Sequence, residues 1–194
     1  MKPGRILLTQ TQIRARVREL GRSITHRYRG KKLLVLGVMN GALFFLADLL
    51  RAVELDDAQI ACVRLASYAG TQSTGLVRGL DGLDEECRGR HVLIVDDILD
   101  TGRTLSAVTE RLTKHGALDV KICVLLEKRR PREVPVRADW TGFKIADEFV
   151  IGYGLDYNGQ YRNLKQVRLL EAKTGQPESP SGFRHDQDPD AFSP

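Results

Sequence analysis

The sequence predicts an α/β fold in which a mainly parallel, twisted sheet has helices on both faces. Runs of apolar residues of strand length alternate along the chain with stretches of helical periodicity. The apolar runs are continuous, as is typical of parallel strands that are buried on both sides. With 194 residues, 42% of them apolar and 28% charged, the chain is long enough for one such domain with a sizeable core.

The helices are indicated by their periodicity and by their ends. The first has a cap at Thr9 or Thr11, keeps its apolar residues on one face and closes at Gly30. The second is the apolar segment ALFFLADLLRAV, which follows the first buried strand. The third, residues 104–115, ends before a glycine in the C′ position. Buried strands are expected at residues 33–39, 60–68, 91–98 and 120–128.

Three segments lie outside this alternation. The segment AGTQSTGLVRGLDGLDEECRG has no apolar period, which is consistent with either an active-site lid or a plain hairpin loop. After the last buried strand, a basic run (KRRPRE) and the short strand-like pieces WTGFKI and EFVIGYG predict a small C-terminal hood subdomain. The C-terminal residues are rich in Pro, Ser, Gly and Asp and are expected to be disordered. The expected bounds are one domain at residues 1–172, with a core at about 9–128 and a hood mainly at 129–172, and a tail at 173–194.

Charge and cysteine content limit the possible functions. The net charge is +5, and the tail has two basic and four acidic residues, so the rest of the chain carries +7. Such a basic body suits anionic ligands such as phosphates or nucleic acid, although an ordinary solvated surface has the same charge. Cys62 and Cys123 lie within apolar runs and are expected in the core. Without a bilayer-length apolar run or a signal peptide pattern, a cytoplasmic protein with no membrane contact is expected.

The stretch VLIVDDILDTGRTL carries the densest functional signal. An apolar strand ends in Asp96 and Asp97, and Asp100 follows, at the sheet edge where parallel α/β proteins bind ligands. Beyond them, Gly102, two threonine hydroxyls and the backbone N–H groups of a helix start make an anion site. A phosphate cradle beside carboxylates suits a ribose 5-phosphate. The alternatives are a capping aspartate with two solvated acids, or a receiver domain, in which the acidic pair comes much earlier in the fold.

The order of apolar strand, two acids, two apolar residues and D-T-G-x-T resembles the phosphoribosyl-diphosphate signature of type I phosphoribosyltransferases. Other segments, from about Leu33 to Leu169, resemble the hypoxanthine-guanine phosphoribosyltransferases in the same order. GVMNGALFFLADLL is similar to that family's first diphosphate-binding loop and helix, and RLASYAGTQSTG to its flexible catalytic loop. LLEKRRPR and DEFVIGYGLDYNGQYRNL are similar to its purine-binding segments. The last segment discriminates best, because orotate and adenine transferases share the carboxylate loop but lack this stretch.

The resemblance implies the type I phosphoribosyltransferase fold and a purine-salvage enzyme. Hypoxanthine and guanine would react with 5-phosphoribosyl 1-diphosphate to give IMP and GMP plus diphosphate, through an oxocarbenium-like transition state and with Mg²⁺ as cofactor. A homodimer or homotetramer is implied as well. Two positions depart from the family pattern, since many relatives have a basic residue where Asn40 stands and a glutamate where Asp96 stands.

The resemblance also implies roles for individual residues. Asp100 would exchange a proton with N7 of the base, and Ser67 and Tyr68 would cover the reaction centre when the long loop closes. Lys128 would donate to the 6-oxo group, and Phe149 would stack on the purine. The ribosyl-diphosphate site would comprise Met39, Asn40, Gly41, Asp96, Asp97, Thr101, Gly102, Arg103, Thr104 and Arg162. The purine site would comprise Lys128, Phe149, Val150 and Asp156, and the metal ligands would be Asp96, Asp97 and Asp156.

Plain structural roles remain open for several of these side chains. Asp156 suits a turn, Arg162 and Arg103 suit a solvated surface, Lys128 suits a solvated strand end, and Phe149 suits the core. At the level of function, one alternative is a transferase with a preference for hypoxanthine alone or for xanthine. The other is a regulatory protein that senses the ribosyl diphosphate and binds nucleic acid. Nucleic-acid binding is not expected, since no helix-turn-helix candidate or basic-aromatic cluster stands out.

Overall fold

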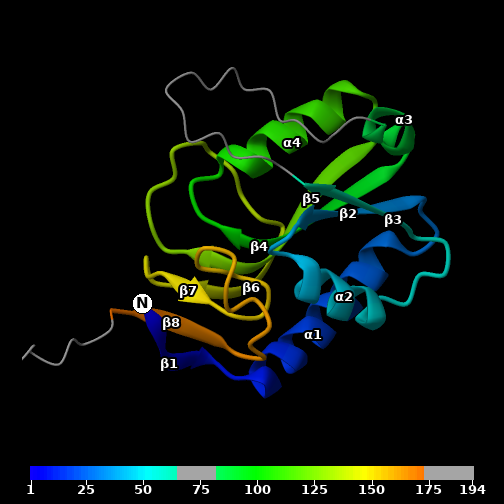
Figure 1. Ribbon diagram of the computed structural model, residues 1–194. Coiled ribbons are helices and arrows are strands. Elements are labelled where there is room, and N and C mark those ends of the chain that lie inside the picture. Colours follow the sequence, from blue (N-terminus) through cyan, green and yellow to red (C-terminus); the bar gives the residue numbers. More distant parts are fainter. Residues whose placement is uncertain (65–81, 173–194) are drawn as a thin grey trace, which may run out of the picture.

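The computed structural model describes residues 1–64 and 82–172, and its main feature is a five-stranded parallel sheet (Figure 1). The expected tail and most of the expected long loop lie outside the described residues. Every neighbouring pair of strands in the sheet is parallel, so the predicted fold class is confirmed. In spatial order the strands are β3 (Gln59–Arg64), β2 (Leu33–Met39), β4 (His91–Leu99), β5 (Asp119–Lys128) and β6 (Trp140–Ile145).

Helices cover both faces of this sheet, as Figure 1 shows. One face is covered by α1 (Gln10–Tyr28) and α2 (Leu43–Ala52), which share a core cluster with it. The other face is covered by the short α3 (Leu83–Cys87) and by α4 (Arg103–Lys114), which belong to a second cluster. The sheet is therefore buried from both sides.

The continuous apolar run of β4 follows from this double burial. Val92 and Ile94 point to the cluster of α3 and α4, whereas Leu93 and Val95 point to the cluster of α1 and α2. All four side chains are fully buried. A strand with one solvated face would instead have alternated between polar and apolar residues.

The helix ends match the sequence signals. Thr9 caps α1 in a reciprocal capping box with Gln12, which decides between the two predicted caps. At the end of α4, Gly116 has a φ of 92°, the left-handed conformation expected at C′. Within the described residues no helix is both long and apolar enough to cross a lipid bilayer.

A second, three-stranded antiparallel sheet forms the hood, in the order β1 (Lys2–Leu8), β8 (Val167–Glu171), β7 (Val150–Ile151). The sequence analysis predicted no strand at the N-terminus, because β1 is short, half-exposed and paired with a strand far along the chain. WTGFKI was read as part of the hood stretch, but it forms β6 and lies in the main sheet. The hood sheet thus combines strands from both ends of the described chain.

The cysteine prediction was right for Cys123 and wrong for Cys62. Cys123 lies in β5, inside the sheet, and its burial raises the pKa of the thiol. Cys62 is exposed because β3 is the edge strand of the sheet. Ile60 on the same strand is 56% exposed, so an apolar strand sequence did not ensure burial at this edge.

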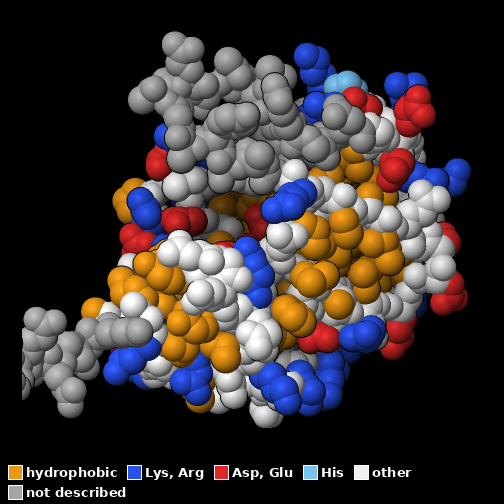
Figure 2. All heavy atoms as spheres, in the orientation of Figure 1, with side chains coloured by type: hydrophobic (Ala, Val, Ile, Leu, Met, Phe, Trp, Pro, Cys, Tyr) orange, Lys and Arg blue, Asp and Glu red, His pale blue; other side chains and the backbone are white. Residues whose placement is uncertain are grey.

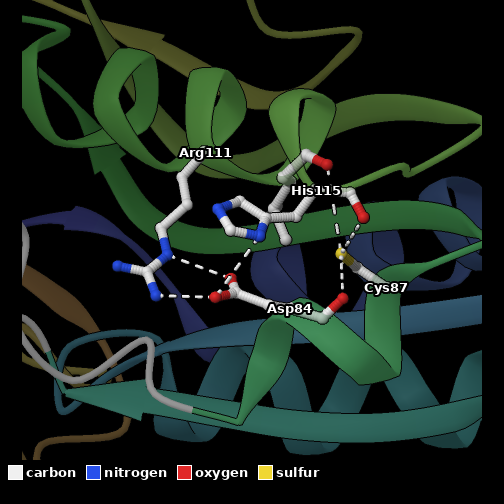
Figure 3. A network of polar contacts seen from close by, with 5 residues as sticks. Asp84, Cys87, Arg111 and His115 are labelled. Carbon is white, nitrogen blue, oxygen red and sulfur yellow. Dashed lines mark hydrogen bonds and ion pairs between the residues drawn. The ribbon is translucent and has the colours of Figure 1, made fainter.

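A polar network attaches α3 to α4 (Figure 3). Asp84 accepts two hydrogen bonds from the Arg111 guanidinium, from Nε at 3.1 Å and from Nη2 at 2.9 Å. His115 Nδ1 lies 3.4 Å from the same carboxylate. The Cys87 thiol is buried against the backbone carbonyls of Asp84, Leu112 and His115. The Arg111 hydrogen bonds hold the pKa of Asp84 below its ordinary value of 3.8.

We expect Asp84→Asn to lower the free energy of unfolding at neutral pH by about 0.5–1 kcal/mol. The effect is modest because the side chains of Arg111 and Asp84 are 27% and 28% exposed. Since the folded pKa is depressed, this stabilisation is present above pH 3.8 and is lost as the pH falls through the folded pKa. Urea unfolding of the wild type and of Asp84→Asn at neutral and acid pH measures this difference in the free energy of unfolding. Glu86→Gln on the same helix is the control. A loss that persists in acid, or an equal loss in the control, would contradict the expectation.

Candidate active site

A cavity of about 370 Å³ opens at the carboxyl ends of β2 and β4, where a parallel sheet is expected to bind ligands. Figure 2 shows charged side chains gathered around a recess on this face. Four apolar residues not predicted for the site, Val38, Ile98, Leu99 and Leu105, complete its wall. The predicted residues that line it are Met39, Gly41, Asp96, Asp97, Asp100, Thr101, Gly102, Thr104, Asp156 and Arg162.

Asp96, which is buried, and Asp97, which is partly buried, form an acidic pair at the end of β4. Asp96 is only 7% exposed, and its Oδ1 accepts a hydrogen bond of 2.9 Å from the backbone N–H of Asp97. Burial, followed by repulsion from Asp97, raises the pKa of Asp96 well above its usual range. Burial also raises the pKa of Asp97, although the Arg162 guanidinium acts in the opposite direction. A hydroxyl-rich or cationic ligand would relieve the cost of this pair.

The turn after β2 lies directly against the acidic pair. A side chain at Gly41 would overlap the carboxylate of Asp97, so only glycine allows this close approach. The Met39–Asn40 peptide bond, in the predicted diphosphate loop, is cis. Asn40 itself is exposed and does not line the cavity.

The loop from Thr101 to Thr104 leads into α4 on the opposite side of the cavity. Gly102 has a φ of 84° and packs against the backbone of Val134, whose N–H donates to the carbonyl of Thr101 at 3.2 Å. Gly102 provides no capping side chain at the start of α4, and among the side chains of the described residues only Thr101 Oγ1 accepts from this turn, at 3.5 Å from the N–H of Arg103. The N–H groups that follow remain suited to a phosphate.

The Arg103 side chain does not take part in this loop. It is 69% exposed and forms an ion pair with Glu133. It does not line the cavity, which favours the solvated alternative for this residue.

A four-residue charge cluster lies beside the acidic pair. Lys128 Nζ, at the end of β5, is 3.2 Å from Asp100 Oδ2 and 3.0 Å from Asp147 Oδ1. Arg130 Nη1 is 3.3 Å from Asp100 Oδ1 and 3.4 Å from Asp147 Oδ2. The hydrogen bond from Lys128 holds the pKa of Asp147 below its usual range, and the charges of both cations add to this. Asp100 Oδ1 is shielded from solvent but accepts no hydrogen bond from the described residues.

The sequence analysis missed two members of this cluster, Arg130 and Asp147. Both lie in stretches that were read as similar to purine-binding segments, LLEKRRPR and DEFVIGYGLDYNGQYRNL, but neither residue was assigned a role. The Lys128 side chain is 12% exposed, which is against the alternative that this lysine is simply solvated at the end of its strand.

Asp156 and Arg162 hold each other at the hood side of the cavity. Arg162 Nη2 lies 2.6 Å from Asp156 Oδ1, and Nη1 donates to the carbonyl of Gly154 at 2.6 Å. The second carboxylate oxygen of Asp156 accepts from the N–H of Gly159 at 2.7 Å. Both side chains line the cavity, so neither is only a turn residue or a surface charge.

The carboxylates suit a magnesium ion that is shared with a substrate. Within residues 1–64 and 82–172, no group of three His, Cys, Asp or Glu side chains is arranged to hold a metal alone. Mg²⁺ commonly takes one or two protein carboxylates and completes its octahedron with water and substrate phosphates. Asp96, Asp97 and Asp156 offer such a partial set of hard oxygen ligands around one cavity.

Phe149 and Val150 do not line the cavity. Phe149 is 54% exposed and packs edge-to-face on Tyr157 at 5.8 Å, so it is not a core residue. Val150 is buried in β7, where it pairs with β8. Ser67 and Tyr68 lie outside the described residues.

Comparison with known proteins identifies the family. A family model described as a phosphoribosyl transferase domain matches residues 5–158. The chain is 42% identical over 165 residues to the hypoxanthine phosphoribosyltransferase of Salmonella typhimurium, covering 84% of this chain and 92% of that protein. It is 41% identical over 168 residues to the hypoxanthine-guanine phosphoribosyltransferase of Lactococcus lactis, covering 86% and 91%.

Solved structures agree with the sequence matches. A hypoxanthine phosphoribosyltransferase from Staphylococcus aureus superposes with a TM-score of 0.81 at 38% identity, covering 87% of this chain and 92% of that one. A hypoxanthine-guanine phosphoribosyltransferase from Bacillus anthracis has a TM-score of 0.81 at 33% identity, covering 88% and 100%. The family resemblance drawn from the sequence is thereby confirmed. The matches in sequence and in structure show that this chain belongs to the hypoxanthine-guanine phosphoribosyltransferase family of type I phosphoribosyltransferase enzymes.

Proposed function

We propose that the protein transfers the phosphoribosyl group of 5-phosphoribosyl 1-diphosphate to N9 of hypoxanthine and guanine, giving IMP and GMP plus diphosphate. The observation that carries this proposal is the pairing of Asp100 with Lys128 at 3.2 Å, beside a cavity that has both a phosphate loop and an acidic pair. A carboxylate and an ammonium group suit the N7 and the 6-oxo group of a purine. Family membership supports the same reaction class.

The ribosyl diphosphate would span the cavity. Its 5-phosphate would take the N–H groups from Thr101 to Thr104, and the ribose hydroxyls would face Asp96 and Asp97. Arg162 and the backbone of the Gly41 turn would face the diphosphate. As the bond at C1 breaks, positive charge develops on the ribose ring, and the carboxylates of Asp96 and Asp97 would face it.

Magnesium would be held by Asp96, Asp97 and Asp156 together with oxygens of the substrate. When bound, it would supply positive charge that compensates the leaving diphosphate. Asp156 would need its Arg162 partner in that state, because the guanidinium fixes the carboxylate at the cavity wall.

The base site would be formed by groups from the hood and from the end of β5. The Asp100 carboxylate, whose Oδ1 is ion-paired with Arg130 but accepts no hydrogen bond from the described residues, would exchange the proton at N7. Lys128 would donate to the 6-oxo group, so adenine, which has an amino group there, would leave this donor unpaired. The exposed ring of Phe149 would stack on the purine, and the Val150 backbone would contact its edge. Ser67 and Tyr68 would cover the reaction centre.

The two alternative functions are less well supported. A preference for hypoxanthine alone or for xanthine would depend on contacts to position 2 of the purine, and no described side chain favours one of these bases. A regulatory protein that binds nucleic acid would not need the acid, the lysine and the acidic pair of a transferase around one cavity.

We also propose that the protein forms a homodimer or homotetramer, because apolar side chains on α2 and β3 are exposed. Leu43 and Phe44 on α2 are 51% and 40% exposed, and Ile60 on β3 is 56% exposed. Figure 2 shows hydrophobic side chains gathered over this part of the surface, which a second copy of the chain would cover. Sedimentation velocity of the purified protein gives the mass that decides the question.

The first test is nucleotide formation from 5-phosphoribosyl 1-diphosphate and magnesium with hypoxanthine, guanine, xanthine, adenine, orotate and uracil offered separately. We expect IMP and GMP, and no product from adenine, orotate or uracil. Chromatographic separation of the nucleotides measures this outcome. Binding of the ribosyl diphosphate without product from any base would overturn the enzyme proposal, and a gel shift with nucleic acid would then test the regulatory alternative.

A further inference from the structure

Arg130 has no role in the reaction described so far, yet it contacts the proposed proton-exchanging group. Its guanidinium lies 3.3 Å from one oxygen of Asp100 and 3.4 Å from one oxygen of Asp147. Lys128 lies against the other oxygen of each of the same two carboxylates. Two cations therefore bridge the same two acids in parallel.

The four charges come from three separate segments. Asp100 follows β4, Lys128 and Arg130 lie at and just beyond the end of β5, and Asp147 lies between β6 and β7. Lys128 is 12% exposed, whereas Arg130 is 35% exposed. The lysine is thus the inner cation of the pair and the arginine the outer one.

Lys128 faces a conflict that Arg130 can resolve. To donate to a base oxygen, the ammonium group has to give up contacts with two carboxylates in a partly buried site. Two acids without a nearby cation would repel each other and hold the lysine back. An arginine that remains on both acids keeps them neutralised, because its Nη1 lies 3.3 Å from Asp100 and 3.4 Å from Asp147.

We propose that Arg130 is a positioning residue for base binding, which keeps Asp100 and Asp147 charge-compensated while Lys128 turns to the 6-oxo group. This inference rests on the proposed function. It assigns Arg130 to the affinity for the base and not to the affinity for the ribosyl diphosphate, because Arg130 does not line the cavity that Asp96, Asp97 and the Thr101–Thr104 loop surround. Lysine at position 130 preserves the charge.

The test is steady-state kinetics of wild type, Arg130→Ser, Arg130→Lys and Arg129→Ser, with each substrate varied in turn. Arg129 is the matched control, since it is the exposed neighbour and forms no ion pair with a described residue. We expect Arg130→Ser to raise the KM for hypoxanthine about fivefold and to change the KM for the ribosyl diphosphate by less than about twofold. Arg130→Lys should recover most of the loss, and Arg129→Ser should match wild type.

The outcomes separate this inference from the proposed function. An unchanged hypoxanthine KM in Arg130→Ser, in a wild type that forms IMP, overturns the inference alone. Equal rises in both KM values together with a lower Tm would also overturn it, because they would assign Arg130 a general structural role. A wild type that forms no nucleotide from any 6-oxopurine overturns the proposed function itself.

Discussion

Asp100→Asn should lower kcat for IMP formation by about 10²- to 10³-fold, while the affinity for the ribosyl diphosphate changes by less than about threefold. Asparagine keeps the shape of the side chain but cannot exchange a proton with the base. It also cannot form the ion pairs with Lys128 and Arg130. The phosphate loop and the acidic pair remain intact in this variant, which is why binding of the other substrate should be spared.

Single-turnover kinetics and calorimetric titration with the ribosyl diphosphate measure the two quantities separately. Asp147→Asn is the matched control, because Asp147 contacts the same two cations but does not line the cavity. We expect its kcat to fall by less than about tenfold. Parallel losses of turnover and of ribosyl-diphosphate affinity in Asp100→Asn would make Asp100 a structural residue.

The parts of the fold that could be predicted from the sequence are those with a local signal. The continuous apolar run of β4 indicated burial on both faces, and a threonine cap, at Thr9 or Thr11, indicated the start of α1. The hood could not be predicted in full, since β1 pairs with β8 at the other end of the described chain. Cys62 shows a similar limit, because nothing in an apolar strand sequence says that the strand lies at the edge of its sheet.

The candidate site also has a part with a local signal in the sequence and a part that depends on tertiary contacts. The stretch from Asp96 to Thr104 is one continuous segment, and a parallel sheet brings its groups to one edge, so composition and order were enough. The cluster of Asp100, Lys128, Arg130 and Asp147 depends on how three segments meet, and the pairing of these residues leaves no periodic trace in the sequence. Electrostatic partners of this kind become visible only when the tertiary arrangement is known.

Close backbone contact between the hood and the Gly41 turn should be the other strong determinant of activity. Gly154 has a φ of 105°, and a side chain there would overlap the carbonyl group of Gly41. The carbonyl of Gly154 also accepts the 2.6 Å hydrogen bond from Arg162. Any displacement at Gly154 would therefore reach both the Gly41 turn and Arg162.

We expect Gly154→Ala to lower the free energy of unfolding by about 2–4 kcal/mol, from backbone strain and the overlap together. It should also lower kcat/KM for the ribosyl diphosphate by about 100-fold, since a misplacement of about 1 Å in a site can cost that much. Gly30→Ala is the control, because Gly30 has a φ of 72° but no atom within 4 Å of an added Cβ. That variant should lose about 1 kcal/mol and keep its activity. Urea unfolding and initial rates measure the two effects. If Gly154→Ala lost no more stability than Gly30→Ala and kept its kcat/KM, the hood and the Gly41 turn would not need this contact.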